Sequence, residues 1–95
     1  MSDCERIVET YWKEMQEVED WAKWLEDEAL EIMKIVDGHG TLRGVIVVLG
    51  IGGPHVELNT RDQTVECWWG RDHAVRYLSS EICGEIEEEV ERWFE

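Results

Sequence analysis

The side chains that carry most enzyme and metal chemistry are few in this sequence. Zinc sites usually take cysteine and histidine ligands in closely spaced pairs, and no such pair occurs here. We therefore predict that the chain binds no zinc tightly. Cys67 and His73 could serve as nucleophile and base, but the strand pattern around Cys67 places it on the predicted core side. The cysteines and histidines are Cys4, Cys67, Cys83, His39, His55 and His73.

Glycines and carboxylates suggest two further kinds of chemistry. The stretch GIGGP at 50–54 has the glycines of a phosphate-binding loop, but it lacks the GK[ST] ending and lies between two predicted strands. We interpret it as a turn. The carboxylates are numerous but form no EF-hand loop. Because no catalytic group, metal site or cofactor is indicated, we predict a binding protein rather than an enzyme.

The N-terminal part of the chain has the pattern of one helix over residues 2–28. Ser2 and Glu5 have the spacing of a capping box. Apolar residues then recur in alternating steps of four and three, which place them on one helix face. The stripe consists of Cys4, Val8, Tyr11, Met15, Val18, Ala22 and Leu25. We interpret it as the side of the helix that packs on a core.

The middle of the chain has the composition of strands. Four segments are rich in β-branched residues or alternate between apolar and polar residues, and a short fifth candidate follows. The links between them are only a few residues long, which favours an antiparallel meander. The segments are 29–36, 41–51, 55–60, 64–70 and 73–78.

A second helix is predicted to begin at Ser79 or Ser80 and to run to the end of the sequence. Its apolar residues form one stripe that can pack on a sheet, namely Ile82, Ile86, Val90 and Trp93, with Cys83 and Phe94 beside them. The whole pattern predicts a single domain, 1–95, of the α+β class. We expect an antiparallel four- or five-stranded sheet with the N-terminal and C-terminal helices packed on one face.

The net charge of −14 is concentrated in the predicted helices. Residues 1–28 carry ten acids and three bases, and residues 79–95 carry seven acids and one base. Residues 29–78 are close to neutral, with six acids and five bases. A chain this acidic is unsuited to direct contact with nucleic acid or anionic membranes, but it suits a basic protein partner. The three cysteines are an odd number without CxxC spacing, which favours a reducing cytosol. The sequence also lacks an apolar run that could span a membrane, so we expect it in the cytoplasm.

The last eleven residues, EIEEEVERWFE, contain six glutamates. Glu87, Glu91 and Glu95 recur at every fourth position, where like charges repel. A helix over 81–95 would be about 22 Å long, and duplex DNA of that length carries roughly 13 phosphate charges. With its net charge of −6, the helix has close to half that charge density.

This density suggests that the helix imitates a nucleic acid strand. The predicted contact residues are Glu85, Glu88, Glu89 and Glu91, with Glu17 and Asp20 as a second row. The expected partner is a basic, nucleic-acid-handling protein such as a CRISPR effector or another defence nuclease. The alternatives are a solvated acidic surface on an interaction module of other function, or a homodimer joined through an exposed sheet face.

Trp68 is the remaining candidate for a binding surface. Strand alternation places it with Thr64 and Glu66, opposite the side assigned to Val65, Cys67 and Trp69. An exposed tryptophan often anchors an interface, whereas a covered one would only pack under a loop or helix. The sequence leaves both open.

Two stretches, GGPHVELNT at 52–60 and VECWWGRDHA at 65–74, resemble a group of small proteins from bacteriophages and prophages of Firmicutes. The resemblance spans residues 29–95 and includes the acidic C-terminal helix. It implies a phage-encoded accessory protein that acts in the host cytoplasm, and it assigns no catalytic residue. Small acidic phage proteins of this size include anti-CRISPR and anti-restriction inhibitors, so analogy by class and size, rather than matched residues, suggests a role in evading host defence.

Overall fold

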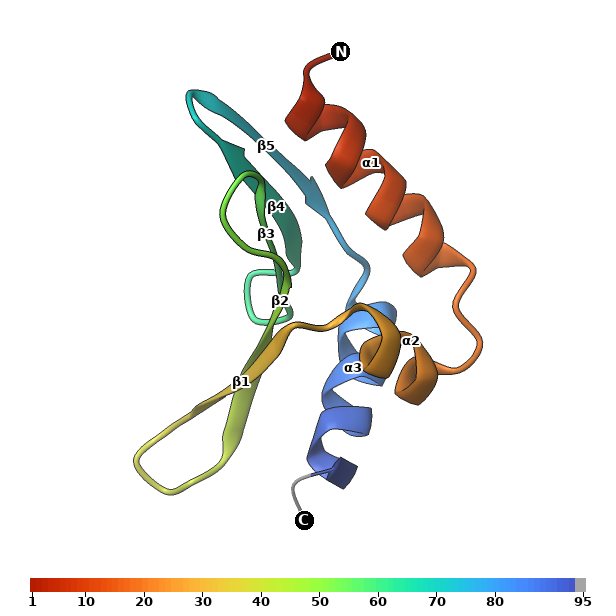
Figure 1. The fold of residues 1–95 in the computed structure, drawn as a ribbon. Coiled ribbons are helices and arrows are strands. Elements are labelled where there is room, and N and C mark those ends of the chain that lie inside the picture. The colour runs from red at the N-terminus through yellow and green to blue at the C-terminus, as the bar shows by residue number, and fades with distance from the viewer. Residues whose placement is uncertain (94–95) are drawn as a thin grey trace.

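The structure, a computed structural model, describes residues 1–93. Phe94 and Glu95, which the sequence pattern assigns to the final helix, lie outside this range. Within it the chain forms two helices, five strands and a third helix (Figure 1). The elements are α1 Asp3–Gln16, α2 Trp21–Glu28, β1 Glu31–Val36, β2 Leu42–Gly50, β3 His55–Asn59, β4 Thr64–Trp69, β5 Asp72–Tyr77 and α3 Ser80–Trp93.

The strands form one antiparallel sheet in the order β1-β2-β3-β4-β5. Each strand pairs with the next one along the chain, because the connections are too short to cross the sheet. The predicted α+β fold with an antiparallel meander is confirmed, including its fifth strand. No helix within residues 1–93 has both the length and the apolar character needed to cross a bilayer.

The prediction of one helix over residues 2–28 is wrong. α1 ends at Gln16 and α2 begins at Trp21, with Asp20 as its N-cap. The Asp20 carboxylate accepts a hydrogen bond from the Lys23 backbone N–H at 3.2 Å, which satisfies one of the free donors at a helix start. The apolar spacing continues across the break because both helices face the same core, with Val18 half-buried between them.

The core lies between the helices and one face of the sheet. Cys4 and Val8 of α1 are almost fully buried, as are Leu25 of α2 and Ile86 and Val90 of α3. They belong to one cluster with the inward residues of β2, β3 and β4, which are Val45, Val47, Leu49, Val56, Leu58, Val65 and Cys67. All three helices therefore cover the same face of the sheet, as Figure 1 shows.

The opposite face of the sheet has no helix over it within the described chain, and we call it the open sheet face. Its residues form rows across the strands, set by the antiparallel register. One row joins His55, Trp68 and His73. Trp69, predicted on the core side, is instead 45% exposed, because it is the last residue of β4 and extends beyond the core.

Candidate binding surfaces

The glutamates of α3 form three groups: an outward group, two that are bonded to tryptophans, and Glu87, which is bonded to Thr60. Glu81, Glu88 and Glu91 are exposed and fall at spacings of seven and three, on one side of the helix. We call these three the acidic face of α3. The Arg92 guanidinium is 3.9 Å from the Glu88 carboxylate. The strongest negative surface of the helix therefore points into solvent.

Glu85 and Glu89 differ from the acidic face because each accepts an indole hydrogen bond. Trp21 Nε1 of α2 donates to Glu85 Oε2 at 2.7 Å, and Trp93 Nε1 donates to Glu89 Oε2 at 3.1 Å. Arg92 also donates to Glu89 at 3.2 Å. The four predicted contact glutamates therefore do not form one uniform row. Glu85, Glu88 and Glu91 are exposed and Glu89 is half-buried, and Glu85 and Glu89 also hold tryptophans in place.

Glu87 has a structural role that the sequence analysis missed. Its carboxylate accepts a hydrogen bond from the Thr60 hydroxyl at 2.7 Å, and that hydroxyl accepts one from the Val45 backbone N–H at 2.8 Å. Thr60 is 3% exposed, so this chain of hydrogen bonds joins α3 to the sheet in a nearly water-free place. The only sequence signal for it was a polar residue, Thr60, at the end of a predicted strand.

The predicted second row, Glu17 and Asp20, lies in the connection between α1 and α2. Glu17 is the C-cap of α1 and Asp20 is the N-cap of α2. Both side chains are exposed. Between them, Val18 lines a depression together with Glu81 and Glu85 of α3. The connection is thus next to the start of α3, and the two rows belong to the same side of the protein.

Trp68 lies on the open sheet face, away from the acidic helices. It is 38% exposed. The His73 ring stacks on it at a centroid distance of 5.5 Å, and the His55 ring is tilted against its other side at 5.6 Å. A glutamate carboxylate contacts each histidine: Glu57 is bonded to His55, and Glu66 to His73. Since Trp68 and α3 are on opposite sides of the sheet, one flat partner surface cannot contact both.

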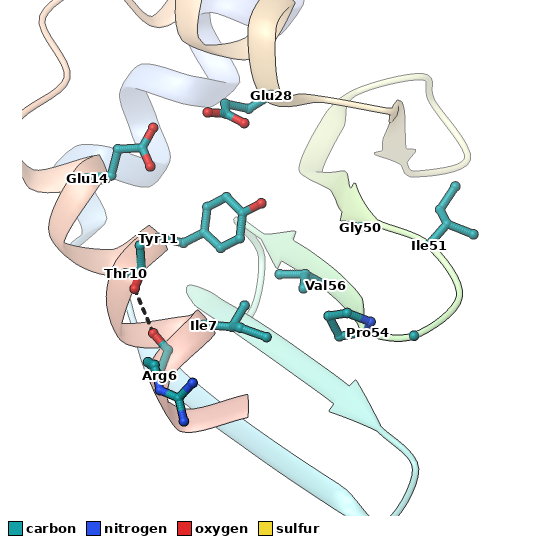
Figure 2. A pocket seen from close by; sticks show the side chains of 11 residues that line it. Arg6, Ile7, Thr10, Tyr11, Glu14, Glu28, Gly50, Ile51, Pro54 and Val56 are labelled. Carbon is teal, nitrogen blue, oxygen red and sulfur yellow. Dashed lines mark hydrogen bonds between the residues drawn. The ribbon is translucent and has the colours of Figure 1, made fainter. Parts of the chain in front are cut away.

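Sequence reasoning also missed a cleft between α1 and the β2–β3 loop, shown in Figure 2. Its volume is about 570 Å³. Its walls are apolar side chains from three elements: Ile7 and Tyr11 of α1, Ile51 and Pro54 of the loop, and Val56 of β3. The glycine-rich GIGGP stretch therefore forms one wall of a cleft.

Two carboxylates lie at one end of this cleft. Figure 2 shows Glu14 of α1 and Glu28 of α2 turned toward the space above the Tyr11 ring. Burial raises the pKa of Glu28, and the charge of Glu14 and a hydrogen bond with its side chain raise it further. The pKa of Tyr11 is raised mainly by burial and then by the charges of Glu28 and Glu14. Trp24 Nε1 donates to Glu14 at 3.0 Å and fixes its position.

The cysteine and histidine side chains are kept apart by the sheet. Cys67 is fully buried on the core side, where burial and a hydrogen bond with Cys4 raise the pKa of its thiol to about 12. A thiol in that state is a poor nucleophile at neutral pH, and His73 lies on the open sheet face. Among residues 1–93, no three histidine, cysteine, aspartate or glutamate side chains gather in a way that could hold a metal ion.

Comparison with known proteins adds no relative: no protein-family model matches the sequence, and neither the curated proteins nor the solved structures give a significant match.

Proposed function

We propose that the protein is an inhibitor that occupies the basic nucleic-acid groove of a host defence nuclease, in particular a CRISPR effector. The observation that carries the proposal is the acidic face of α3. Its carboxylates project into solvent from a helical layer that contains nearly all of the net charge. A groove built to hold phosphates offers the matching positive surface.

The physical basis of this binding is electrostatic. Glu88 and Glu91 would occupy positions of phosphates, with Glu85 and Glu89 at the edge and Glu17 and Asp20 on the adjoining connection. Charges arranged in this way steer a basic partner and speed association. The same charges are screened by salt. Binding should therefore weaken as ionic strength rises, and the nuclease's own DNA or RNA should compete for the groove.

The source and setting of the protein belong to the same proposal. The stretches GGPHVELNT and VECWWGRDHA support a phage or mobile-element origin, which would place the protein in the cytoplasm of an infected host. An inhibitor of host defence nucleases would there protect the invading genome. It would work by occupying the groove stoichiometrically rather than by catalysis.

A matched pair of variants tests the proposal. Glu88→Gln with Glu91→Gln removes two charges from the acidic face of α3, while Glu31→Gln with Asp62→Asn removes two charges from exposed positions in β1 and the β3–β4 turn. The probe is a guide-loaded CRISPR effector with its target DNA. We expect the parent and the Glu31/Asp62 variant to inhibit DNA cleavage, and the α3 variant to associate roughly tenfold more slowly, in the range of electrostatic steering.

Two results would contradict the proposal. One is equal inhibition by all three proteins, which would make the acidic face of α3 a solvated surface only. The other is a failure to inhibit any member of a panel of CRISPR effectors and restriction nucleases, combined with recovery from host lysate of partners that handle no nucleic acid.

A second candidate function is self-association through the open sheet face. Tyr77 is 73% exposed there, and Met33, Trp68 and Val75 are each close to 40% exposed. The face belongs to the nearly neutral middle of the chain, so two copies that each carry −14 can approach there with least repulsion. Sedimentation velocity tests this: the parent should dimerise, and Val75→Lys, which sets like charges against each other, should be monomeric. A parent that stays monomeric at high concentration would exclude it.

A further inference from the structure

The cleft between α1 and the β2–β3 loop is large enough for a small ligand. Its volume of about 570 Å³ lies within the usual range of ligand pockets, about 300–1,000 Å³. The loop that forms one wall is tightly packed: a Cβ added at Gly50 would lie 3.1 Å from the Pro54 carbonyl oxygen, and one at Gly53 would lie 3.0 Å from Trp69 Nε1. At the rim, Ile51 is 66% exposed. The cleft thus has a fixed wall and an uncovered apolar edge.

The two carboxylates that line the cleft lie together at one end of it. Glu14 and Glu28 face each other there above the Tyr11 ring (Figure 2). None of the ion pairs formed within residues 1–93 joins either carboxylate to a basic side chain. Arg6 lines the other end of the cleft, where its guanidinium is paired with Asp3 at 3.1 Å. The carboxylates are instead held close to each other, which costs free energy that a bound cation would offset.

Apolar walls that lead to an aromatic ring and two carboxylates select a particular chemistry. A primary ammonium or a guanidinium donates strong hydrogen bonds to carboxylates and is attracted by the face of an aromatic ring. An aliphatic stem attached to it packs on apolar side chains while the charged head reaches its partners. An inorganic cation would leave the apolar walls without contacts.

We propose that this cleft binds an aliphatic ammonium or guanidinium ion, with its charge between Glu14 and Glu28 and its stem along Ile7, Pro54 and Val56. The ligand is either a free polyamine or a lysine or arginine side chain exposed on a protein. The site uses none of the α3 residues to which the inhibitor function is assigned, so the test of this cleft is independent of the test of the inhibitor function.

The test uses the whole chain, isotope-labelled for NMR, with two probes: spermidine for the free amine and N-acetyl-lysine methylamide for the side chain. We expect saturable shifts of the Trp24 indole N–H, which is bonded to Glu14, and of the Ile7 and Val56 methyl groups. Tighter binding of spermidine would assign the cleft to free polyamines, and equal or tighter binding of the lysine analogue would assign it to protein side chains.

Two double variants separate this site from general attraction of cations to an acidic protein. Glu14→Gln with Glu28→Gln removes the carboxylates of the cleft but keeps an acceptor for Trp24. Glu26→Gln with Asp27→Asn removes the same charge from exposed neighbouring positions on α2. Affinity should fall at least about tenfold in the first variant, as expected for lost hydrogen bonds to charged groups, and change little in the second.

The proposal fails if both variants lose affinity equally, because the cations would then be sensing only the net charge. It also fails if neither probe gives saturable shifts, or if the shifts are spread over α3 and leave the cleft unchanged. Thermal unfolding of each variant confirms that it is folded before its affinity is compared.

Discussion

Some of the many glutamates in this chain serve as hydrogen-bond acceptors for indole N–H groups. Trp21, Trp24 and Trp93 each donate to a glutamate from another turn or another helix, at 2.7, 3.0 and 3.1 Å. Trp21 and Trp24 are largely buried, so their N–H groups need acceptors, and a carboxylate is a strong one. Some glutamates that look like surface charge in the sequence are therefore acceptors for the large aromatic side chains of the helical layer.

Thr60 provides a sharp test of how α3 is attached to the sheet. Thr60→Val keeps the shape of the side chain but leaves the Val45 N–H and the Glu87 carboxylate without their partner. An unsatisfied buried polar group costs about 1–3 kcal/mol, so we expect a loss of that size in the free energy of unfolding, measured in urea. Thr60→Ser keeps the hydroxyl and serves as the control. Equal stability of parent and Thr60→Val would mean that water replaces the hydroxyl.

Glu28 should make stability depend on pH in an unusual direction. Burial raises its pKa above the ordinary value of 4.5, with Glu14 and then Asp27 adding to the effect, and Tyr11 also faces it across the cleft. A raised pKa means that the folded state binds the proton more tightly than the unfolded state, so ionisation of Glu28 destabilises the fold as pH rises through that pKa.

Glu28→Gln imitates the protonated side chain and tests this sign. At neutral pH the variant should unfold at a higher temperature than the parent, and the difference should shrink as pH falls through the raised pKa of Glu28. Glu26→Gln, at an exposed position of the same helix, should show a smaller change. A variant that is less stable than the parent at neutral pH would refute the unfavourable pairing with Glu14.

At the level of elements, the break between α1 and α2 shows the limit of periodicity. Spacings of three and four residues report which side faces the core, and that side was predicted correctly for Cys4, Val8, Met15 and Leu25. These spacings do not show whether one helix continues or a second one begins, because two consecutive helices that pack on the same core can have the same spacing of apolar residues. Asp20 belongs to a residue type that favours helix N-caps, but the apolar stripe alone does not show where a cap interrupts it.

Asp20 has two assigned roles that substitutions can separate. As the N-cap of α2 it accepts from the Lys23 N–H, and Asp20→Ala should cost about 1 kcal/mol of stability. Asp20→Asn removes the charge but caps a helix equally well. If Asp20 also contacts a basic partner, Asp20→Asn should bind more weakly at unchanged stability. If instead Asp20→Asn binds as the parent does, Asp20 is only a cap.

For the whole molecule, the fold was more predictable than the surfaces. The positions of the strands could be predicted from their composition and from the short links between them. The single apolar stripe on each predicted helix indicated that the helices pack on one side of the sheet. The cleft could not be predicted, because Ile7, Glu28 and Pro54 come from α1, α2 and the β2–β3 loop and line one space only through the packing of these three segments. The exposure of Trp68 was also undecided in the sequence, since alternation gives the face of the sheet but not what covers it.

The net charge of −14 should affect stability differently at different positions of α3. Glu88→Gln with Glu91→Gln relieves repulsion and should raise the free energy of unfolding by a few tenths of a kcal/mol at low salt, an effect that added salt reduces. Glu85→Gln with Glu89→Gln removes equal charge but weakens the acceptors of Trp21 and Trp93, so stability should fall by about 0.5–1.5 kcal/mol. Equal shifts in urea denaturation would show that only net charge matters.

The same indole–carboxylate bonds give the molecule an optical readout of its own. Indole emission responds to the charge beside the ring, and the rings of Trp21 and Trp93 are bonded to carboxylates at the edge of the acidic face of α3, while Trp24 is bonded to the carboxylate at the end of the cleft. A cation bound at the acidic face of α3 would change the electric field at Trp21 and Trp93, whereas a cation bound in the cleft would change it at Trp24. Single replacements by phenylalanine would assign each emission change to its surface, so that the two binding events could be followed separately in an unlabelled protein.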